Sequence, residues 1–219
     1  MPKKTQAVKG KNMEGAIAHW YAKNTSSNRD GFRKEAAALA AQMKSGDTVL
    51  EVAPGPGYLA VELAKLGDFR VVGVDYSFTF VQIARGEAKR AGVWADFRQG
   101  DAAHLPCNDN DFDLIVCRAA FKNFGDPVGA IREMHRVLKP GGTAHIIDMR
   151  KDATDKDIAR EVAGMKMGSL MALTTRYILR DLRKRAYTRE AFEEMIAETP
   201  FGHGDIQADG IGFEVTLKK

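Results

Sequence analysis

Short apolar runs alternate with amphipathic stretches along the middle of the chain. Runs rich in Val, Ile and Phe are typical of buried strands, and apolar residues that recur every three or four positions are typical of helices. Their alternation predicts a parallel sheet covered by helices. Pro140 and the two glycines after it predict the end of the third helix. The expected strands are residues 48–53, 70–75, 95–99, 112–117 and 143–149, and the expected helices lie near 57–66, 78–91 and 127–138.

The alternation of strand and helix patterns ends after the fifth strand. Residues 155–186 show a long helical pattern in place of another short strand–helix unit. An amphipathic helix needs a surface against which its apolar side is buried. We therefore expect a helical insert that caps the carboxyl edge of the sheet, with Met167, Met171 and Tyr177 facing either a substrate pocket or that edge. The apolar stripe is Met167, Leu170, Met171, Thr174, Tyr177 and Ile178, and the basic face is Arg176, Arg180, Arg183 and Lys184.

The last part of the chain carries signals for a helix and a strand pair. Thr188 is placed as the N-cap of the helical stretch that follows it. Asp209-Gly210 is a turn signal, and beyond it apolar residues alternate with polar ones as far as Leu217. We expect a terminal antiparallel pair of strands that closes the sheet.

Length and composition limit the number of domains and the cellular location that we expect. With 219 residues and 44% hydrophobic residues, the chain can build one sizeable core, so we expect residues 13–219 to form a single domain. No apolar run approaches the roughly 20 residues of a membrane span, and the charged N-terminus lacks the apolar region of a secretory signal. The two cysteines, Cys107 and Cys117, do not suggest a disulfide framework, so we expect a cytoplasmic protein.

The net charge of +4 is matched by four lysines at the N-terminus. Lys3, Lys4, Lys9 and Lys11 have no acidic residue among positions 1–11, so the rest of the chain has no overall excess of positive charge. A nucleic-acid enzyme usually carries a basic footprint on its body. We therefore expect residues 1–12 to be a flexible basic tail, and we do not expect a nucleic acid as partner.

The strongest local signal for a ligand is the segment VLEVAPGPGYLAVELAKLG, residues 49–67. A hydrophobic strand ends there in a Gly/Pro turn, and an amphipathic helix follows at once. Gly55 and Gly57 remove side chains where a ligand must approach the backbone, and the start of the next helix directs N–H groups toward that ligand. The segment predicts a nucleotide-type site, and a plain strand–helix turn is the alternative.

The same segment nearly matches a dinucleotide fingerprint. Gly55, Gly57 and Ala60 fit G-x-G-x-x-A, and Asp75 lies where a ribose-binding acid belongs. A nicotinamide-dependent oxidoreductase is therefore a rival interpretation. Against it, Glu51 places a charge near the end of an otherwise apolar strand. The chain also has no Tyr-x-x-x-Lys pair and is too short for a separate substrate domain.

Five segments, in this order and at this spacing, resemble the motifs of class I S-adenosylmethionine-dependent methyltransferases of the small-molecule branch. The likeness extends over roughly residues 15–150. The family's first motif, an acid followed by alternating glycines, reads EVAPGPG here, with Ala53 in place of the first glycine. The segments are residues 51–57, GVDYS (73–77), QGDAAHLP (99–106), FDLIVCRAAFKNFGDP (112–127) and HRVLKPGG (135–142).

The resemblance implies an α/β fold, a Rossmann-like, mostly parallel seven-stranded sheet with an antiparallel C-terminal strand and a helical insert after strand five. It also implies S-adenosylmethionine (SAM) as cofactor and S-adenosylhomocysteine as product. Asp75 would hold the ribose hydroxyls, Tyr76 would lie along the adenine, and Asp101 would meet the adenine amino group. Tyr21 would close the site. The full expected cofactor set is Tyr21, Glu51, Ala53, Pro54, Gly55, Gly57, Tyr58, Asp75, Tyr76, Ser77, Gly100, Asp101, Ala102 and Arg118.

Some features depart from the family or carry no assignment. Relatives often have a histidine pair after strand four, where this chain has Lys122-Asn123, so no catalytic role of those histidines carries over. The histidines and cysteines show no metal-ligand spacing, so no metal is expected. His104 follows the adenine segment and is a candidate for the substrate pocket. No general base is assigned, and the oligomeric state is left open.

The sequence thus predicts methyl transfer from SAM to a small organic molecule. Because SAM is already a strong methyl donor, the protein's main task is to align the acceptor and exclude water. Three alternatives stay open. They are an RNA or protein methyltransferase that uses the basic tail, a nicotinamide-dependent oxidoreductase, and a SAM-binding module without catalysis.

Overall fold

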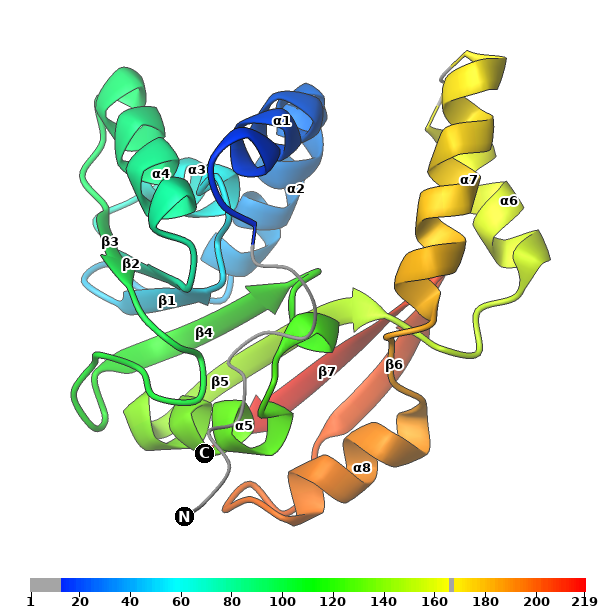
Figure 1. Ribbon diagram of the computed structural model, residues 1–219. Helices are drawn as coiled ribbons and strands as arrows, with labels where there is room; N and C mark the ends of the chain where they lie inside the picture. Colours follow the sequence, from blue (N-terminus) through cyan, green and yellow to red (C-terminus); the bar gives the residue numbers. More distant parts are fainter. Residues whose placement is uncertain (1–12, 166–167) are drawn as a thin grey trace, which may run out of the picture.

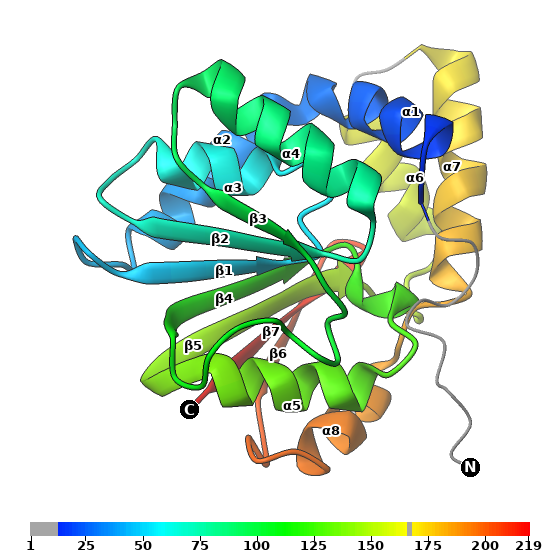
Figure 2. The same ribbon diagram turned by 60° about the vertical axis from the view of Figure 1, so that its left-hand side comes forward.

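A seven-stranded sheet with helices on both faces forms the body of the molecule, as a computed structural model shows (Figures 1 and 2). The structure describes residues 13–165 and 168–219, so the expected basic tail lies outside the described residues. Parallel strands buried on both faces read as apolar runs, which is why the sequence marks them clearly. The strands are β1 (Thr48–Val52), β2 (Arg70–Asp75), β3 (Asp96–Gln99), β4 (Phe112–Arg118), β5 (Leu138–Met149), β6 (Asp205–Asp209) and β7 (Gly212–Lys218).

The predicted fold class is confirmed. The strand order is β3-β2-β1-β4-β5-β7-β6, with β1 to β5 parallel, β7 antiparallel to β5, and β6 antiparallel to β7. The chain first builds outward from β1 to β3 and then returns to add β4 on the other side of β1. This reversal leaves a crevice at the carboxyl ends of β1 and β4, where sheets of this kind bind ligands.

Helices cover the two faces of the sheet in separate groups. Figure 2 shows α1 (Ala16–Thr25), α2 (Arg29–Ala40), α3 (Tyr58–Ala64) and α4 (Phe78–Ala91) on one side. On the other side lie α5 (Pro127–Val137) and α8 (Arg189–Ala197), whose apolar residues join the larger core cluster. Short 3-10 helices span Ser26–Asn28 and Phe121–Asn123. Of the described helices, none is long and apolar enough to cross a membrane.

Local signals in the sequence agree with the ends of several elements. The Ser77, Asp126 and Thr188 side chains cap α4, α5 and α8 by accepting backbone N–H hydrogen bonds. Residues 138–142 differ from expectation. Helix α5 ends at Val137, but β5 begins directly at Leu138 because this residue pairs with Phe112 of β4.

Residues 155–186 hold two helices, α6 (Asp155–Gly164) and α7 (Ser169–Arg183), which stand apart from the α1–α4 layer in Figure 1. A small cluster of apolar residues joins them, in which Leu179 and Leu182 of α7 pack beside Ile158 and Val162 of α6. A box of hydrogen bonds between Thr154 and Asp157 fixes the start of α6.

The burial that we expected for the apolar stripe of this insert is wrong. Met171 is 60% exposed and Tyr177 is 75% exposed, and neither lines the cavity described below. The reason is that α7 packs on α6 through its Leu179 and Leu182 side and leaves its opposite side to solvent. Met167 lies outside the described residues.

Candidate functional site

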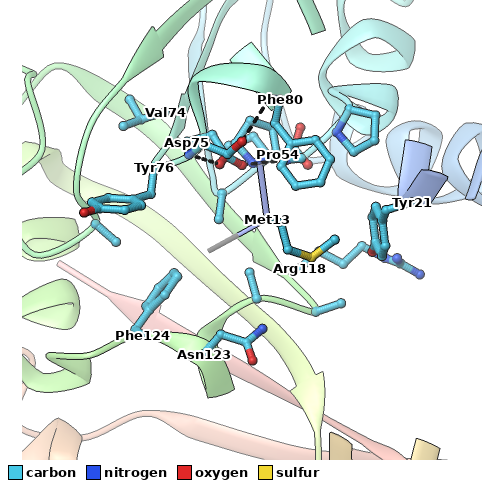
Figure 3. Close-up of a pocket in the computed structure, with 18 of the residues that line it drawn as sticks. Met13, Tyr21, Pro54, Val74, Asp75, Tyr76, Phe80, Arg118, Asn123 and Phe124 are labelled. Carbon is cyan, nitrogen blue, oxygen red and sulfur yellow. Dashed lines mark hydrogen bonds between the residues drawn. The ribbon is translucent and has the colours of Figure 1, made fainter. Parts of the chain in front are cut away.

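A cavity of about 330 Å³ opens at the carboxyl ends of β1, β2 and β4 (Figure 3). Its walls come from segments far apart in the sequence. Gly57 stands just behind the wall, where it begins α3 with φ at 77° and leaves no room for a Cβ beside Ala84 and Phe97. The structure brings these expected cofactor residues to the cavity: Tyr21, Glu51, Ala53, Pro54, Gly55, Tyr58, Asp75, Tyr76, Ser77, Gly100, Asp101, Ala102 and Arg118.

Asp75 lies at the centre of the polar part of this wall. Its carboxylate accepts hydrogen bonds from the backbone N–H groups of Gly55 and Ser77, both at 2.8 Å. Burial raises the pKa of Asp75, and the two hydrogen bonds oppose that shift. Each carboxylate oxygen has further acceptor capacity, so a ligand with two adjacent hydroxyl groups can bind there.

The turn between β1 and α3 follows the surface of the cavity closely. Ala53 has a φ of 57°, in the left-handed region that favours glycine, which fits the glycine of the motif that this turn resembles. Its N–H donates to the carbonyl of Val74 at 2.8 Å, which fixes the turn beside β2. A Cβ at Gly55 would meet no protein atom within 4 Å, so this glycine borders open space.

Glu51 is a buried carboxyl group beneath that turn. It is 4% exposed, and its Oε2 accepts a hydrogen bond of 2.9 Å from the backbone N–H of Ala60. Burial raises the pKa of Glu51 to about 8, which leaves the group neutral at pH 7. The charge that the sequence places at the end of β1 is therefore absent at neutral pH.

Arg118, at the end of β4, is held by helix α2. Its Nε lies 2.6 Å from the Glu35 carboxylate, and its guanidinium lies over the Phe32 ring at 5.2 Å from the centroid. Burial raises the pKa of Glu35, and the positive charge of Arg118 opposes that shift. Sequence analysis placed Arg118 at the site but missed these two residues that hold it.

The segment around α1 covers another side of the cavity. Tyr21 meets Phe80 edge to face, with ring centroids 5.8 Å apart, and Met13 lies at the cavity wall (Figure 3). Glu14 ties this segment down by accepting hydrogen bonds from the N–H groups of Phe78 and Thr79 at the start of α4. No local signal in the sequence predicts this contact, because Phe78 and Thr79 lie 64 and 65 residues after Glu14.

Lys122 and Asp148 form a buried ion pair in the wall beyond β4. The Lys122 Nζ donates to the Asp148 Oδ1 at 2.8 Å and to the carbonyl of Ala119 at 2.6 Å. The Asp148 Oδ2 accepts the Lys122 N–H, also at 2.8 Å. The motif that this segment resembles often has a histidine at this position. Here a lysine fills it, and a partner on β5 compensates its charge.

The remaining predicted residue lies away from the cavity. His104 does not line it, and its side chain is 83% exposed, with Nδ1 3.8 Å from the Asp101 carboxylate. Among the described residues, no cluster of three or more His, Cys, Asp or Glu side chains is placed to hold a metal. Residues that the sequence did not suggest complete the cavity wall, chief among them Ala119, Ala120, Lys122, Asn123, Phe124, Leu182 and Arg185.

Replacing Glu51 by Gln should flatten the pH dependence of stability. The folded chain keeps Glu51 protonated up to about pH 8, whereas the unfolded chain loses that proton near pH 4.5, so folding binds a proton in between. The unfolding free energy of the wild type should fall by about 1.4 kcal/mol per pH unit across this window relative to the variant. Urea unfolding of both proteins at pH 5, 6, 7 and 8 measures the difference, and parallel curves would contradict the assignment.

Replacing Lys122 by Met should destabilise the fold by about 3–5 kcal/mol, because Asp148 would remain buried without its cation. The double change Lys122→Met with Asp148→Asn should recover part of that loss, since no unpaired charge is left. Lys184→Met with Asp181→Asn, an exposed ion pair, serves as the control and should change stability by less than about 1 kcal/mol. Chemical denaturation gives the values, and a single variant as stable as the control would show that the pair is dispensable.

Comparisons with known proteins agree with this geometry. Residues 50–146 match the model of a methyltransferase domain family. The chain is 40% identical over 106 residues to the ubiquinone/menaquinone biosynthesis C-methyltransferase of Bdellovibrio bacteriovorus, covering 48% of this chain and 45% of that protein. It is 36% identical over 125 residues to a demethylmenaquinone methyltransferase of Deinococcus radiodurans, covering 57% and 52%. The chain thus spans about half the length of the curated relatives it matches.

The fold as a whole recurs in a solved structure. A SAM-dependent methyltransferase from Aquifex aeolicus superimposes with a TM-score of 0.67 at 20% identity, over 90% of this chain and 97% of that one. The family match, residues 50–146, includes the turn after β1 and Asp75 at the end of β2. Residues 50–146 are therefore similar to a methyltransferase domain, and the chain has the fold seen in a SAM-dependent methyltransferase.

Proposed function

We propose that this protein transfers a methyl group from SAM to a small acceptor of the quinol class. The observation that carries the proposal is the composition of the cavity. Asp75 and the turn at Gly55 form a polar wall at the ends of β1 and β2, and a mainly apolar wall lies across from it after β4. The two relatives named above, a C-methyltransferase of quinone biosynthesis and a demethylmenaquinone methyltransferase, suggest the acceptor class.

The residues on the polar side fit SAM. Asp75 has acceptor capacity for the two ribose hydroxyls, and the open space at Gly55 lets the ligand approach the backbone. Tyr76, 42% exposed at the cavity, offers a ring face to the adenine, with Asp101 and Ala102 at its edge. Arg118 offers a cation for the carboxylate of the methionine part, beneath Tyr21. We assign these roles on the geometry and on the family resemblance together.

The acceptor would lie against the wall after β4. Phe124 supplies an aromatic surface, and the Asn123 Oδ1 is buried without a hydrogen-bond partner among the described residues (Figure 3). A buried acceptor atom without a partner is costly, and a hydroxyl group of the acceptor molecule would satisfy it. We therefore assign Asn123 to the binding of a quinol hydroxyl.

Bound SAM supplies a methyl group on a positively charged sulfur, which is already a strong electrophile. The chain's own residues then have to hold the acceptor in line with that methyl group and exclude water. Tyr21, Phe80 and Phe124 make the cavity walls apolar where the two ligands would meet. No residue is assigned as a base. The location we propose is cytoplasmic, which fits two cysteines that form no disulfide.

Asp75→Asn should weaken S-adenosylhomocysteine binding about tenfold to a hundredfold, because the variant loses the charged acceptor for the ribose hydroxyls. Asn retains a side-chain oxygen for one of the two backbone N–H groups, so the variant should fold. Asp96→Asn, at the amino end of β3, is the matched control and should bind normally. Isothermal titration calorimetry at equal pH gives the affinities. Tight binding of NADH with no binding of SAM would overturn the methyltransferase proposal.

Turnover with a quinol acceptor tests the second half of the proposal. The wild type should convert SAM to S-adenosylhomocysteine in the presence of a reduced 2-alkyl-1,4-naphthoquinone. Asn123→Leu should lower that rate about tenfold to a hundredfold while S-adenosylhomocysteine affinity stays within twofold. Asn108→Leu, on an exposed loop, is the control. A wild type that binds SAM but never consumes it would indicate a binding module, and an unaffected Asn123→Leu would remove Asn123 from the acceptor site.

A further inference from the structure

The exposed side of α7 presents large apolar side chains to solvent. Leu170 is 81% exposed, Leu173 is 66% exposed and Tyr177 is 75% exposed, and Met171 and Ile178 flank them at 60% and 42%. These five residues, called here the apolar face of α7, recur at the three- and four-residue spacing that places side chains on one side of a helix. Contiguous exposed apolar surface of this kind usually marks an interaction site.

The rest of α7 is held in place by the protein. Its opposite side carries Leu179 and Leu182, which pack in the small cluster with α6. Arg183 donates to the carbonyl of Ala153 at 2.7 Å, and the Arg180 Nη2 lies 3.1 Å from the Asp155 carboxylate at the start of α6. The apolar face is therefore presented on a packed helix, and the open side has a fixed direction.

Positive charge runs along one edge of the apolar face. Arg176, Arg180 and Lys184 follow one another at four-residue intervals, so they line up along the helix. Residues 169–185 contain five basic residues and a single acidic one, Asp181. Long basic side chains beside an apolar stripe can bury their stems while their charged ends reach anionic groups.

We propose that the apolar face of α7 docks on an anionic lipid bilayer, with the helix lying in the plane of the interface. The apolar residues would enter the boundary between headgroups and acyl chains, and the basic edge would contact the anionic headgroups. The charge argues against a second copy of this chain as the occupant. A twofold dimer through this face would bring the two basic edges close together, and the two acids beside each edge, Asp155 and Asp181, are outnumbered by its basic residues.

The position of α7 relative to the cavity suggests what docking would achieve. Leu182 and Arg185, at the C-terminal end of the helix and just beyond it, line the same cavity as Asp75. Docking along α7 would therefore hold the end of the helix that lines the cavity close to the lipid. The docking inference rests on surface chemistry alone and does not depend on methyl transfer.

Vesicle flotation tests the inference with the full chain and without SAM. Vesicles of phosphatidylcholine with about 30% phosphatidylglycerol should carry the wild type to the top of the gradient, and pure phosphatidylcholine should carry much less. Leu170→Ser with Leu173→Ser should reduce binding about tenfold or more, because two leucines no longer enter the interface. Arg176→Gln with Lys184→Gln should lose most of the preference for anionic vesicles, and added salt should imitate that loss.

Matched controls separate the apolar face from other sources of binding. Leu66→Ser with Trp94→Ser removes exposed apolar residues, 50% and 69% exposed, at the amino ends of β2 and β3, and should bind vesicles like the wild type. A chain without residues 1–11 lacks four lysines and should keep binding that depends on Leu170 and Leu173. Each variant should keep its thermal midpoint and its S-adenosylhomocysteine affinity, which shows that folding and the cofactor site are intact.

Any of the following results would overturn the proposal. The first is a wild type that stays at the bottom of the gradient with anionic vesicles. The second is a Leu170→Ser, Leu173→Ser variant that floats as well as the wild type, or binding that vanishes when residues 1–11 are removed. The third is sedimentation of the wild type without vesicles as a dimer that the two leucine changes convert to a monomer, since the apolar face would then belong to a second copy.

Discussion

The cavity depends on one carboxylate that joins two loops. Asp75 ends β2, yet it accepts N–H groups from the turn after β1 and from the start of α4. A parallel sheet brings the carboxyl ends of its strands to one edge, but it does not fix how the loops beyond that edge lie relative to one another. Asp75 supplies that link, and the same residue lines the cavity. A substitution there therefore acts on the shape of the wall as well as on ligand contacts.

Ionisable groups around the cavity are tolerated in two different ways. Glu51 is buried, and burial outweighs the opposing charge of Arg118, so the group avoids the cost of a buried charge by staying protonated at pH 7. Lys122 is buried as well, but Asp148 compensates it and the carbonyl of Ala119 takes a second hydrogen bond. Neither Glu51 nor the Lys122–Asp148 pair therefore leaves an uncompensated charge beside the cavity at pH 7.

Sequence patterns predicted the sheet, the turn after β1 and Asp75, because each has a local signature in buried runs, glycines or a strand end. They did not predict Phe32, Glu35 or the clamp at Glu14, which act through contacts between segments far apart in the chain. The periodicity of apolar residues correctly predicted that they lie on one side of α7. Periodicity does not show whether another part of the protein covers that side, so the prediction that Met171 and Tyr177 are buried was wrong. The cofactor and acceptor roles stay predictions.

The order in which the sheet is completed has a consequence for how the chain folds. The β5 edge pairs with β7, and Thr143 meets Lys218, so the whole of α6, α7, α8 and β6 must be made before that edge is covered. During synthesis from the N-terminus, Ala144 and Ile146 lie on a strand that is paired only with β4 while Val215 and Leu217 are still missing. Unpaired edges of this kind attract other chains and slow folding. A nascent chain halted after α6 would expose the unpaired edge of β5, which is prone to aggregate. Chaperones bind intermediates of this kind.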